Sequence, residues 1–318
     1  MRIILAFCIL AATLLSTAAP AETLRERLQN RRGEAQQQGD QGSASLRERL
    51  GSRTRGGDTA DLPAGALLQK DIAYGAHAKQ KIDVYLPASP QNAPIIFMVH
   101  GGGWNRGDKN NPGVVNNKAA HWLAKGYILV SANYRMIGDG ADPYVQAQDV
   151  ARALAYVQAQ AAKWGGDAAR IVTMGHSAGA HLVGLLAVQP KIAFDQGAQP
   201  WRGTVMLDSG AVDVEALMRA PHAKLYDKPF GEDPALWRQT SLTAQLSDQA
   251  VPLLMVCSAT RKDKPCAQAE GLAKLMAGRG LRGIVHPENL NHGEINANLG
   301  TAGNYTDTVD RFITSVMP

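Results

Sequence analysis

Ser177 lies in a stretch whose residue types and spacing suit a nucleophile. The sequence from Ile171 to Leu182 is IVTMGHSAGAHL, which places a glycine two positions before the serine and another two positions after it. This G-x-S-x-G pattern follows an apolar run typical of a buried strand and precedes a run typical of a helix. A serine on so sharp a turn needs small neighbours, because only then can its hydroxyl stand clear of the backbone. The pattern predicts that Ser177 is a nucleophile at the end of a strand.

Two histidines lie close to this serine in the sequence, yet neither is predicted to activate it. His176 directly precedes Ser177 on the turn, so its side chain should point away from the hydroxyl. His181 follows about one helical turn later and should point into the fold or along the helix. We predict that both histidines have packing roles and that the general base lies elsewhere.

A second pattern, HGGGW, occupies His100 to Trp104, directly after the apolar run PIIFMV. Consecutive glycines after a strand allow bare backbone to approach a substrate closely and to direct N–H groups toward it. The pattern therefore predicts an anion-stabilising loop beside the serine.

HGGGW upstream of GHSAGAH resembles the α/β-hydrolase fold, in particular the HGGG-type carboxylesterases of the hormone-sensitive-lipase-like and arylformamidase-like branches. The resemblance extends over residues 72–316. It implies that the backbone N–H groups of Gly102, Gly103 and Ala178 form an oxyanion hole. It also implies a triad whose members follow the chain order serine, acid, histidine.

The resemblance assigns the general base to His292. This residue lies in the segment NLNHGE, directly after the last strand-like run, where the family keeps its base. His286 lies within that run, and His222 lies in a long segment with no strand end to fix it. We expect His292 to take the proton of Ser177.

The resemblance assigns the acid to Asp263, which follows the apolar run ending at Ser258. Related sequences often carry the aspartate sooner after this strand, where this chain has Arg261. Asp263 therefore lies about two residues further along the chain than the acid of those sequences. Asp208, at the end of an earlier apolar run, and Asp213 beyond it are the alternatives. Asp213 is expected to cap the helix that follows it. The prediction is Asp263, with Asp208 left open.

Three cysteines occur in the chain, of which Cys8 lies in a predicted leader. The other two, Cys257 and Cys266, lie on either side of Asp263. Two cysteines in an exported chain suggest one disulfide, and a bridge here would tether the loop that carries Asp263.

Composition divides the 318-residue chain into three parts. Residues 1–21 have the pattern of a secretory signal peptide, with an apolar run and an A-x-A site. Residues 22–62 are rich in Arg, Gln and Gly and repeat LRERL, and we interpret them as a disordered or weakly helical spacer. Residues 63–318 are long enough for one α/β-hydrolase domain.

Short apolar runs alternate with helical periodicity through this domain, which predicts an α/β fold with a mostly parallel sheet covered by helices on both faces. The run Ile82 to Pro87 ends in proline and is expected to be an edge strand. The segment 211–250 is long for a connection and is expected to form a small cap over the site. The other expected strands cover residues 94–100, 127–134, 170–175, 203–210, 251–258 and 282–289, and the expected helices cover residues 144–164, 178–188 and 266–279.

These features predict a serine carboxylic-ester hydrolase that works through an acyl-enzyme. Two alternatives remain: an amide or formamide hydrolase with the same triad, and a non-catalytic binding protein with the same fold. No zinc-type Cys/His spacing or phosphate-binding glycine motif occurs, so we predict no cofactor and no metal. The expected partner is a small-molecule ester. We expect no nucleic acid, no stable membrane anchor, and export to the periplasm or the medium; the sequence leaves the oligomeric state open.

Overall fold

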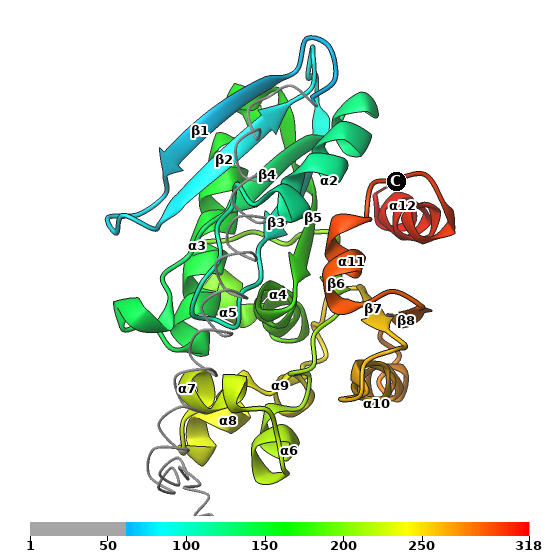
Figure 1. Ribbon diagram of the computed structural model, residues 1–318. Helices are drawn as coiled ribbons and strands as arrows, with labels where there is room; N and C mark the ends of the chain where they lie inside the picture. The colour runs from blue at the N-terminus through cyan, green and yellow to red at the C-terminus, as the bar shows by residue number, and fades with distance from the viewer. Residues whose placement is uncertain (1–61, 318) are drawn as a thin grey trace, which may run out of the picture. The chain divides into compact units, whose positions relative to one another are not determined.

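The computed structural model describes residues 62–317 (Figure 1). The predicted signal peptide (1–21) and all but the last residue of the predicted spacer (22–62) lie outside the described residues. Within the described part, no helix is both long enough and apolar enough to cross a membrane.

One eight-stranded sheet organises the described residues, in the order β1-β2-β4-β3-β5-β6-β7-β8. The six strands from β4 to β8 in this order run parallel, whereas β2 is antiparallel to β4 and β1 is antiparallel to β2. This confirms the predicted α/β-hydrolase fold with a mostly parallel sheet. The strands are β1 (Leu67–Ala73), β2 (Lys81–Leu86), β3 (Ala93–Val99), β4 (Ile128–Ala132), β5 (Gly166–His176), β6 (Gly203–Leu207), β7 (Leu253–Ser258) and β8 (Gly283–Glu288).

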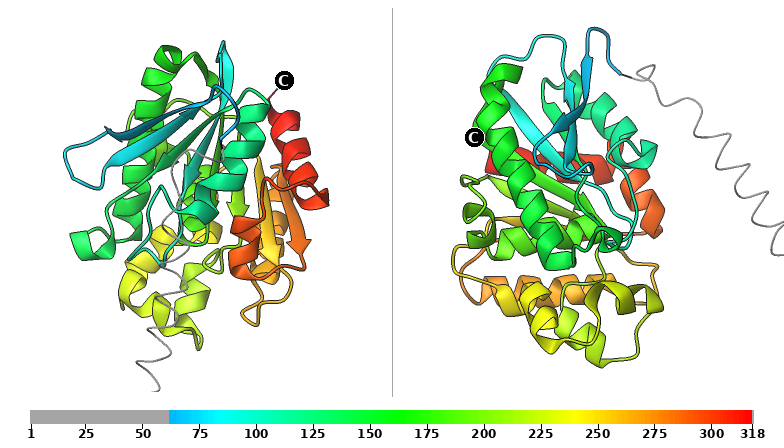
Figure 2. Two further views of the ribbon diagram at one scale, coloured as in Figure 1. Left: turned by 45° about the horizontal axis from the view of Figure 1, so that its top comes forward. Right: turned by 90° about the vertical axis from the view of Figure 1, so that its left-hand side faces the viewer.

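Helices cover both faces of the sheet (Figures 1 and 2). One apolar core includes side chains of α3, α4 and α10, and a second core, on the other face, includes side chains of α2, α11 and α12. Because helices bury the central strands on both faces, the sequences of these strands are continuous apolar runs. The helices of the two layers are α2 (Pro112–Ala124), α3 (Pro143–Gln160), α4 (Ala178–Val188), α5 (Lys191–Phe194), α10 (Pro265–Ala277), α11 (His292–Ala297) and α12 (Asn304–Val316), with 3₁₀ turns η1 (Ile137–Asp139) and η2 (Ala161–Trp164).

The predicted edge position of β2 is wrong, because β1 pairs with its outer side. The sequence of β1, LLQKDIA, carries charges in its middle and leaves most of its residues exposed. An edge strand of this kind has too weak an apolar pattern to be recognised from composition.

The segment between β6 and β7 forms short helices that gather at one end of the sheet, coloured yellow-green in Figure 1. This agrees with the expected cap over residues 211–250. Asp213 accepts a hydrogen bond from the Ala216 N–H at 2.9 Å, so it caps the first of these helices as predicted. The cap consists of α6 (Val214–Arg219), η3 (Lys224–Tyr226), α7 (Asp227–Phe230), α8 (Pro234–Thr240) and α9 (Leu242–Gln245).

Candidate active site

Ser177 stands at the sharp turn between β5 and α4. Its φ of 56° and ψ of −117° lie outside the regions that L-residues favour, so the turn is strained. The Ser177 N–H donates to the carbonyl of Leu207 on neighbouring β6 at 2.9 Å. The end of the adjacent strand therefore supports the turn that presents the hydroxyl.

The two glycines of G-x-S-x-G are needed because backbone passes too close for a side chain. A Cβ on Gly175 would lie 2.3 Å from the carbonyl oxygen of Gly179. A Cβ on Gly179 would lie 2.3 Å from the carbonyl oxygen of Val99 on β3. These contacts bring the start of α4 against the ends of two strands and thereby fix the position of Ser177.

His292 is the histidine that meets Ser177. It is the first residue of α11, which Asn291 caps by accepting hydrogen bonds from the N–H groups of Gly293 and Glu294. Its Nε2 lies 3.0 Å from the Ser177 Oγ, within hydrogen-bond distance. The structure thus brings together the two residues that the sequence selected as nucleophile and base.

Asp208 supplies the carboxylate on the other side of this imidazole. Its Oδ2 lies 2.6 Å from His292 Nδ1, and its side chain is fully buried. Its Oδ1 accepts the N–H of Ser258 at 2.8 Å. Burial alone raises the pKa of the Asp208 carboxyl, but hydrogen bonds from His292, Ser258 and Arg261 outweigh burial and hold the pKa below its ordinary value. Asp208 is therefore a buried carboxylate that stays ionised.

Asp263, the predicted acid, does not occupy this place. Its carboxylate is bound by Arg261, through Nε at 2.9 Å and through Nη2, and its side chain is 45% exposed. Asp208 follows β6, which neighbours the strand carrying Ser177, whereas Asp263 follows β7, one strand further away. Arg261 stands between Asp263 and the imidazole, because its Nη1 lies 3.1 Å from His292 Nδ1 while its Nε and Nη2 bind Asp263. The alternative that the sequence left open, Asp208, replaces Asp263 at this contact.

His176 contacts the main chain of the candidate base and not the nucleophile. Its Nε2 lies 2.9 Å from the carbonyl oxygen of His292, and the centres of the two rings are 4.5 Å apart. Burial, reinforced by the nearby His292, lowers the pKa of His176 to about 3. A neutral His176 donates its Nε2–H to that carbonyl, which leaves this nitrogen unable to take a proton from Ser177.

His181 is likewise committed to structural contacts. Its Nδ1 accepts the indole N–H of Trp104 at 3.2 Å, and its Nε2 lies 2.8 Å from the carbonyl oxygen of Thr240 in the cap. Burial lowers the pKa of His181 to about 4. Because Nδ1 accepts a hydrogen bond, the ring is neutral and Nε2–H donates to the Thr240 carbonyl. This histidine thus connects the HGGGW loop, α4 and the cap.

The HGGGW loop packs directly against the nucleophile. A Cβ on Gly101 would lie 2.8 Å from the Ser177 Cβ, and Gly102 and Gly103 have φ values of 132° and 60°. The carbonyl of buried Trp104 accepts the side-chain N–H of Gln146 at 2.9 Å. The glycines therefore adopt a backbone path that side chains would block, close to Ser177. The third predicted oxyanion donor, Ala178, is the first residue of α4.

The cap lies beside the HGGGW loop. The aromatic rings of Trp104 and Phe230 meet edge to face with their centres 4.9 Å apart, and Lys228 Nζ donates to the side-chain oxygen of Asn105 at 3.1 Å. Leu225, which is 53% exposed, lies 3.9 Å from the position that a Gly103 Cβ would take. An exposed apolar side chain thus stands beside the glycines of the loop.

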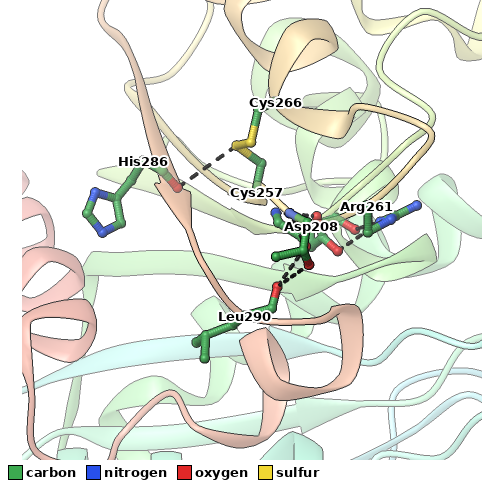
Figure 3. The surroundings of a disulfide bond; sticks show 8 residues. Asp208, Cys257, Arg261, Cys266, His286 and Leu290 are labelled. Carbon is green, nitrogen blue, oxygen red and sulfur yellow. Dashed lines mark hydrogen bonds and ion pairs between the residues drawn. A yellow bond between two sulfur atoms is a disulfide. The ribbon is translucent and has the colours of Figure 1, made fainter.

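A disulfide joins Cys257 at the end of β7 to Cys266 at the start of α10 (Figure 3). The residues between them include Arg261 and Asp263. Among residues 62–317, no group of three or more His, Cys, Asp or Glu side chains is arranged to hold a metal ion.

Comparison with known proteins identifies the family of the chain. The family described as BD-FAE matches residues 82–276, more than half of the chain. The chain belongs to the BD-FAE family. The match runs from β2 to α10, so it includes the HGGGW loop, Ser177 and Asp208 but ends before His292.

Individual relatives match over shorter stretches. A probable carboxylic ester hydrolase, LipM of Mycobacterium tuberculosis, is 32% identical over 154 residues, which cover 44% of this chain and 35% of LipM. Kynurenine formamidase of Danio rerio is 29% identical over 149 residues, which cover 46% of this chain and 47% of that enzyme. The chain thus spans less than half the length of these curated relatives.

The fold is also found among solved structures. Esterase B of Lactobacillus rhamnosis superimposes with a TM-score of 0.66 at 19% identity, over 89% of this chain and 94% of the esterase. At this identity the likeness shows the fold alone, and that fold is the α/β-hydrolase fold.

Proposed function

We propose that this protein is a serine carboxylic-ester hydrolase with the triad Ser177, His292 and Asp208. A continuous chain of polar contacts supports this proposal. Ser177 Oγ lies 3.0 Å from His292 Nε2, and His292 Nδ1 lies 2.6 Å from the buried Asp208 carboxylate. A serine, an imidazole and a carboxylate in this order are the components of nucleophilic acyl transfer.

In the first half of the reaction, the Ser177 oxygen attacks the acyl carbon while His292 Nε2 takes the serine proton. The N–H groups of Gly102, Gly103 and Ala178 stabilise the negative oxygen of the tetrahedral intermediate. The bond from the acyl carbon to the alcohol oxygen then breaks, and His292 returns the proton to the leaving alcohol. In the second half, water repeats the attack on the acyl-enzyme and the carboxylic acid is released, with Ser177 restored.

Asp208 orients His292 throughout this cycle. It accepts the Nδ1–H, which leaves Nε2 free to accept the serine proton, and its negative charge stabilises the imidazolium. The low pKa of Asp208 suits this role, since only the ionised carboxylate carries the negative charge that stabilises the imidazolium.

The proposal is tested with p-nitrophenyl esters of increasing acyl length, each assayed with the wild-type protein and with Ser177→Ala. Hydrolysis that depends on Ser177 is the expected result. Complete inertness toward the esters and toward a serine-directed fluorophosphonate would instead favour the non-catalytic binding protein.

Formamide hydrolysis is the second candidate, favoured by the similarity to kynurenine formamidase. The same triad can attack an amide carbon, with the amine as the leaving group. An N-formyl aromatic amide assayed beside the esters separates the two candidates. If kcat/KM for the amide exceeds kcat/KM for every ester, formamide hydrolysis becomes the first candidate.

We further propose that the protein is exported after cleavage at the A-x-A site. The pattern of residues 1–21 and the pairing of Cys257 with Cys266 support this proposal. Sequencing of the exported protein should find Glu22 as the first residue, and non-reducing peptide mapping should recover the two cysteines in one linked peptide pair. Two free thiols would contradict the disulfide.

A further inference from the structure

Arg261, in the loop that follows β7, lies against the carboxylate of the proposed triad (Figure 3). Its Nη1 donates to Asp208 Oδ2 at 2.8 Å and to the Asp208 carbonyl at 3.2 Å. The same nitrogen lies 3.1 Å from His292 Nδ1. When Nδ1 carries its proton, both nitrogens donate to one carboxylate oxygen, so the positive charge of the guanidinium lies directly beside the imidazole ring.

Asp263 balances this charge from the other side of the guanidinium. It receives Nε and Nη2 of Arg261 in a two-bond arrangement, while Nη1 remains on Asp208. Arg261 is 19% exposed, whereas Asp263 is 45% exposed. The order of groups is therefore a partly exposed carboxylate, a mostly buried arginine, a buried carboxylate and the imidazole.

The loop that carries these two residues is fixed at several points. The disulfide from Cys257 to Cys266 closes its ends, with the two Cα atoms 5.2 Å apart. Ser258 Oγ donates to the carbonyl of Leu290 at 2.6 Å, which ties the loop to the segment that precedes His292. Arg261 is thus held in place and is not a freely moving surface arginine.

We infer that Arg261 is a positioning residue that orients Asp208 and, through its charge, opposes protonation of His292, and that Asp263 moderates this effect by neutralising part of that charge. The inference rests on the proposed hydrolase function, since it deepens the roles given there to Asp208 and His292. It assigns a purpose to Asp263, the carboxylate that the triad does not use.

The physical basis is the interaction of charges at short distance. A positive charge about 3 Å from an imidazole disfavours a second positive charge on the ring, and a carboxylate bound to the first charge offsets part of that effect. Removing Arg261 should therefore make His292 easier to protonate. Removing the charge of Asp263 should make His292 harder to protonate. The two changes have opposite signs.

Other titratable groups also surround His292, and they remain the same in all the variants compared. His176 is neutral because burial, and next the nearby His292, lower its pKa to about 3. Lys118 of α2 donates to the carbonyl of Asn296 in α11, and burial lowers its pKa to about 7. Other groups on or against α11 and the preceding strand include Glu294, Glu288, His286, Tyr305 and the triad partner Asp208. From the cap, Tyr226 lies near Arg261 and Asp263. Differences between variants therefore report on Arg261 and Asp263.

The test is the pH profile of kcat/KM for p-nitrophenyl butyrate, measured with the full chain between pH 5 and 9. Activity requires neutral His292, so activity falls on the acid side as His292 is protonated. Arg261→Met should move this acid limb to higher pH, and Asp263→Asn should move it to lower pH, each by on the order of half to one pH unit. When Asp263→Asn is added to Arg261→Met, it should shift the acid limb by less than half as much as it does in the wild-type protein.

Two further variants act as controls. Arg261→Lys keeps a positive charge, so its acid limb should lie close to the pH of the wild-type limb. Lys262→Met removes a charge from an exposed neighbour on the same loop and should shift the limb by less than about 0.2 pH unit. A purely structural role would lower kcat at every pH in both Arg261→Met and Asp263→Asn, without shifts of opposite sign, and would overturn the inference.

An NMR titration of the His292 imidazole, assigned by its loss in His292→Ala, gives the same comparison without turnover. Should Arg261→Met fail to fold, Asp263→Asn alters a half-exposed side chain and still provides one signed shift. Opposite NMR shifts in a protein with no Ser177-dependent hydrolysis would overturn the proposed function alone. Shifts of the same sign, or none, would overturn the role of Arg261 whatever the activity.

Discussion

At the scale of single residues, Asp208 is the clearest difference between expectation and structure. If it orients His292, Asp208→Asn should lower kcat by roughly 10⁴-fold, because an amide NH₂ at this place favours the wrong imidazole tautomer. The Asn side-chain oxygen can still accept the Ser258 N–H, so the fold should persist. Circular dichroism measures whether the fold persists, and ester hydrolysis at neutral pH measures kcat. Full activity in Asp208→Asn beside an inactive Asp263→Asn would return the acid to the loop after β7.

Ser177 and His292 should behave as one unit at this scale. Ser177→Ala and His292→Ala should each lower kcat by several orders of magnitude, and the double variant should be little slower than either, since neither residue retains its function without the other. His176→Gln, by comparison, should affect stability or rate only modestly. Near-complete activity in His292→Ala, with loss in His176→Gln or His181→Gln, would show that the base has been misassigned.

The sequence contained enough information to select the nucleophile and the base, because each has a local signal. Ser177 has flanking glycines, and His292 lies in the short segment after the last strand. The acid has no such signal, since the ends of β6 and β7 both carry aspartates and only spatial arrangement decides between them. Arg261 was noted in the sequence only as the residue that stands where relatives carry the acid. Its contacts with Asp208 and Asp263 depend on a side-chain direction that the sequence does not reveal.

At the scale of elements, the turn from β5 to α4 depends on the close approach of three backbones. Gly179→Ala would place a Cβ 2.3 Å from the Val99 carbonyl and should destabilise the protein by about 1–3 kcal/mol, as overpacking does. Gly271→Ala is the matched control, because this helix α10 position has no heavy atom within 4 Å of the added Cβ. It should stabilise the protein by about 0.5–1 kcal/mol. Thermal unfolding of both variants measures the contrast, and equal effects would show that the turn is not tightly constrained.

Elements were predicted well where burial on both faces produced a continuous apolar run, as in β3, β4 and β7. The helix α4 begins and ends at the predicted residues, since its apolar sequence is bounded by Ser177 and by Gln189. Strand β1 was missed because its charged middle hides the strand pattern, and that omission made β2 an expected edge. A tertiary neighbour, and not local sequence, decides which strand lies at the edge.

At the scale of the whole molecule, buried histidines connect the site to the pH dependence of stability. The pKa of His176 is lowered to about 3 and that of His181 to about 4, mainly by burial. Both lie below the ordinary value of about 6.5 that an unfolded chain would show. Each histidine therefore contributes stability that is fully present above about pH 6.5 and is lost as the pH falls toward its folded-state pKa. The same packing that holds the nucleophile turn and the cap thus makes the described domain sensitive to acid.

The size of this effect can be measured for His181. Between about pH 6 and 4.5, an unfolded chain binds nearly one more proton at this residue than the folded chain, so the histidine adds about 1 kcal/mol per pH unit to the slope of the unfolding free energy. Urea unfolding across this range should therefore give a shallower slope for His181→Gln than for the wild type. His222→Gln is the control: the Ala220 carbonyl and the Asp227 carboxylate accept hydrogen bonds from the His222 ring and raise the pKa of His222, so removing this histidine should not flatten the slope. An unchanged slope in His181→Gln would mean that His181 can be protonated in the folded state, and that its contact with Trp104 does not hold the ring neutral.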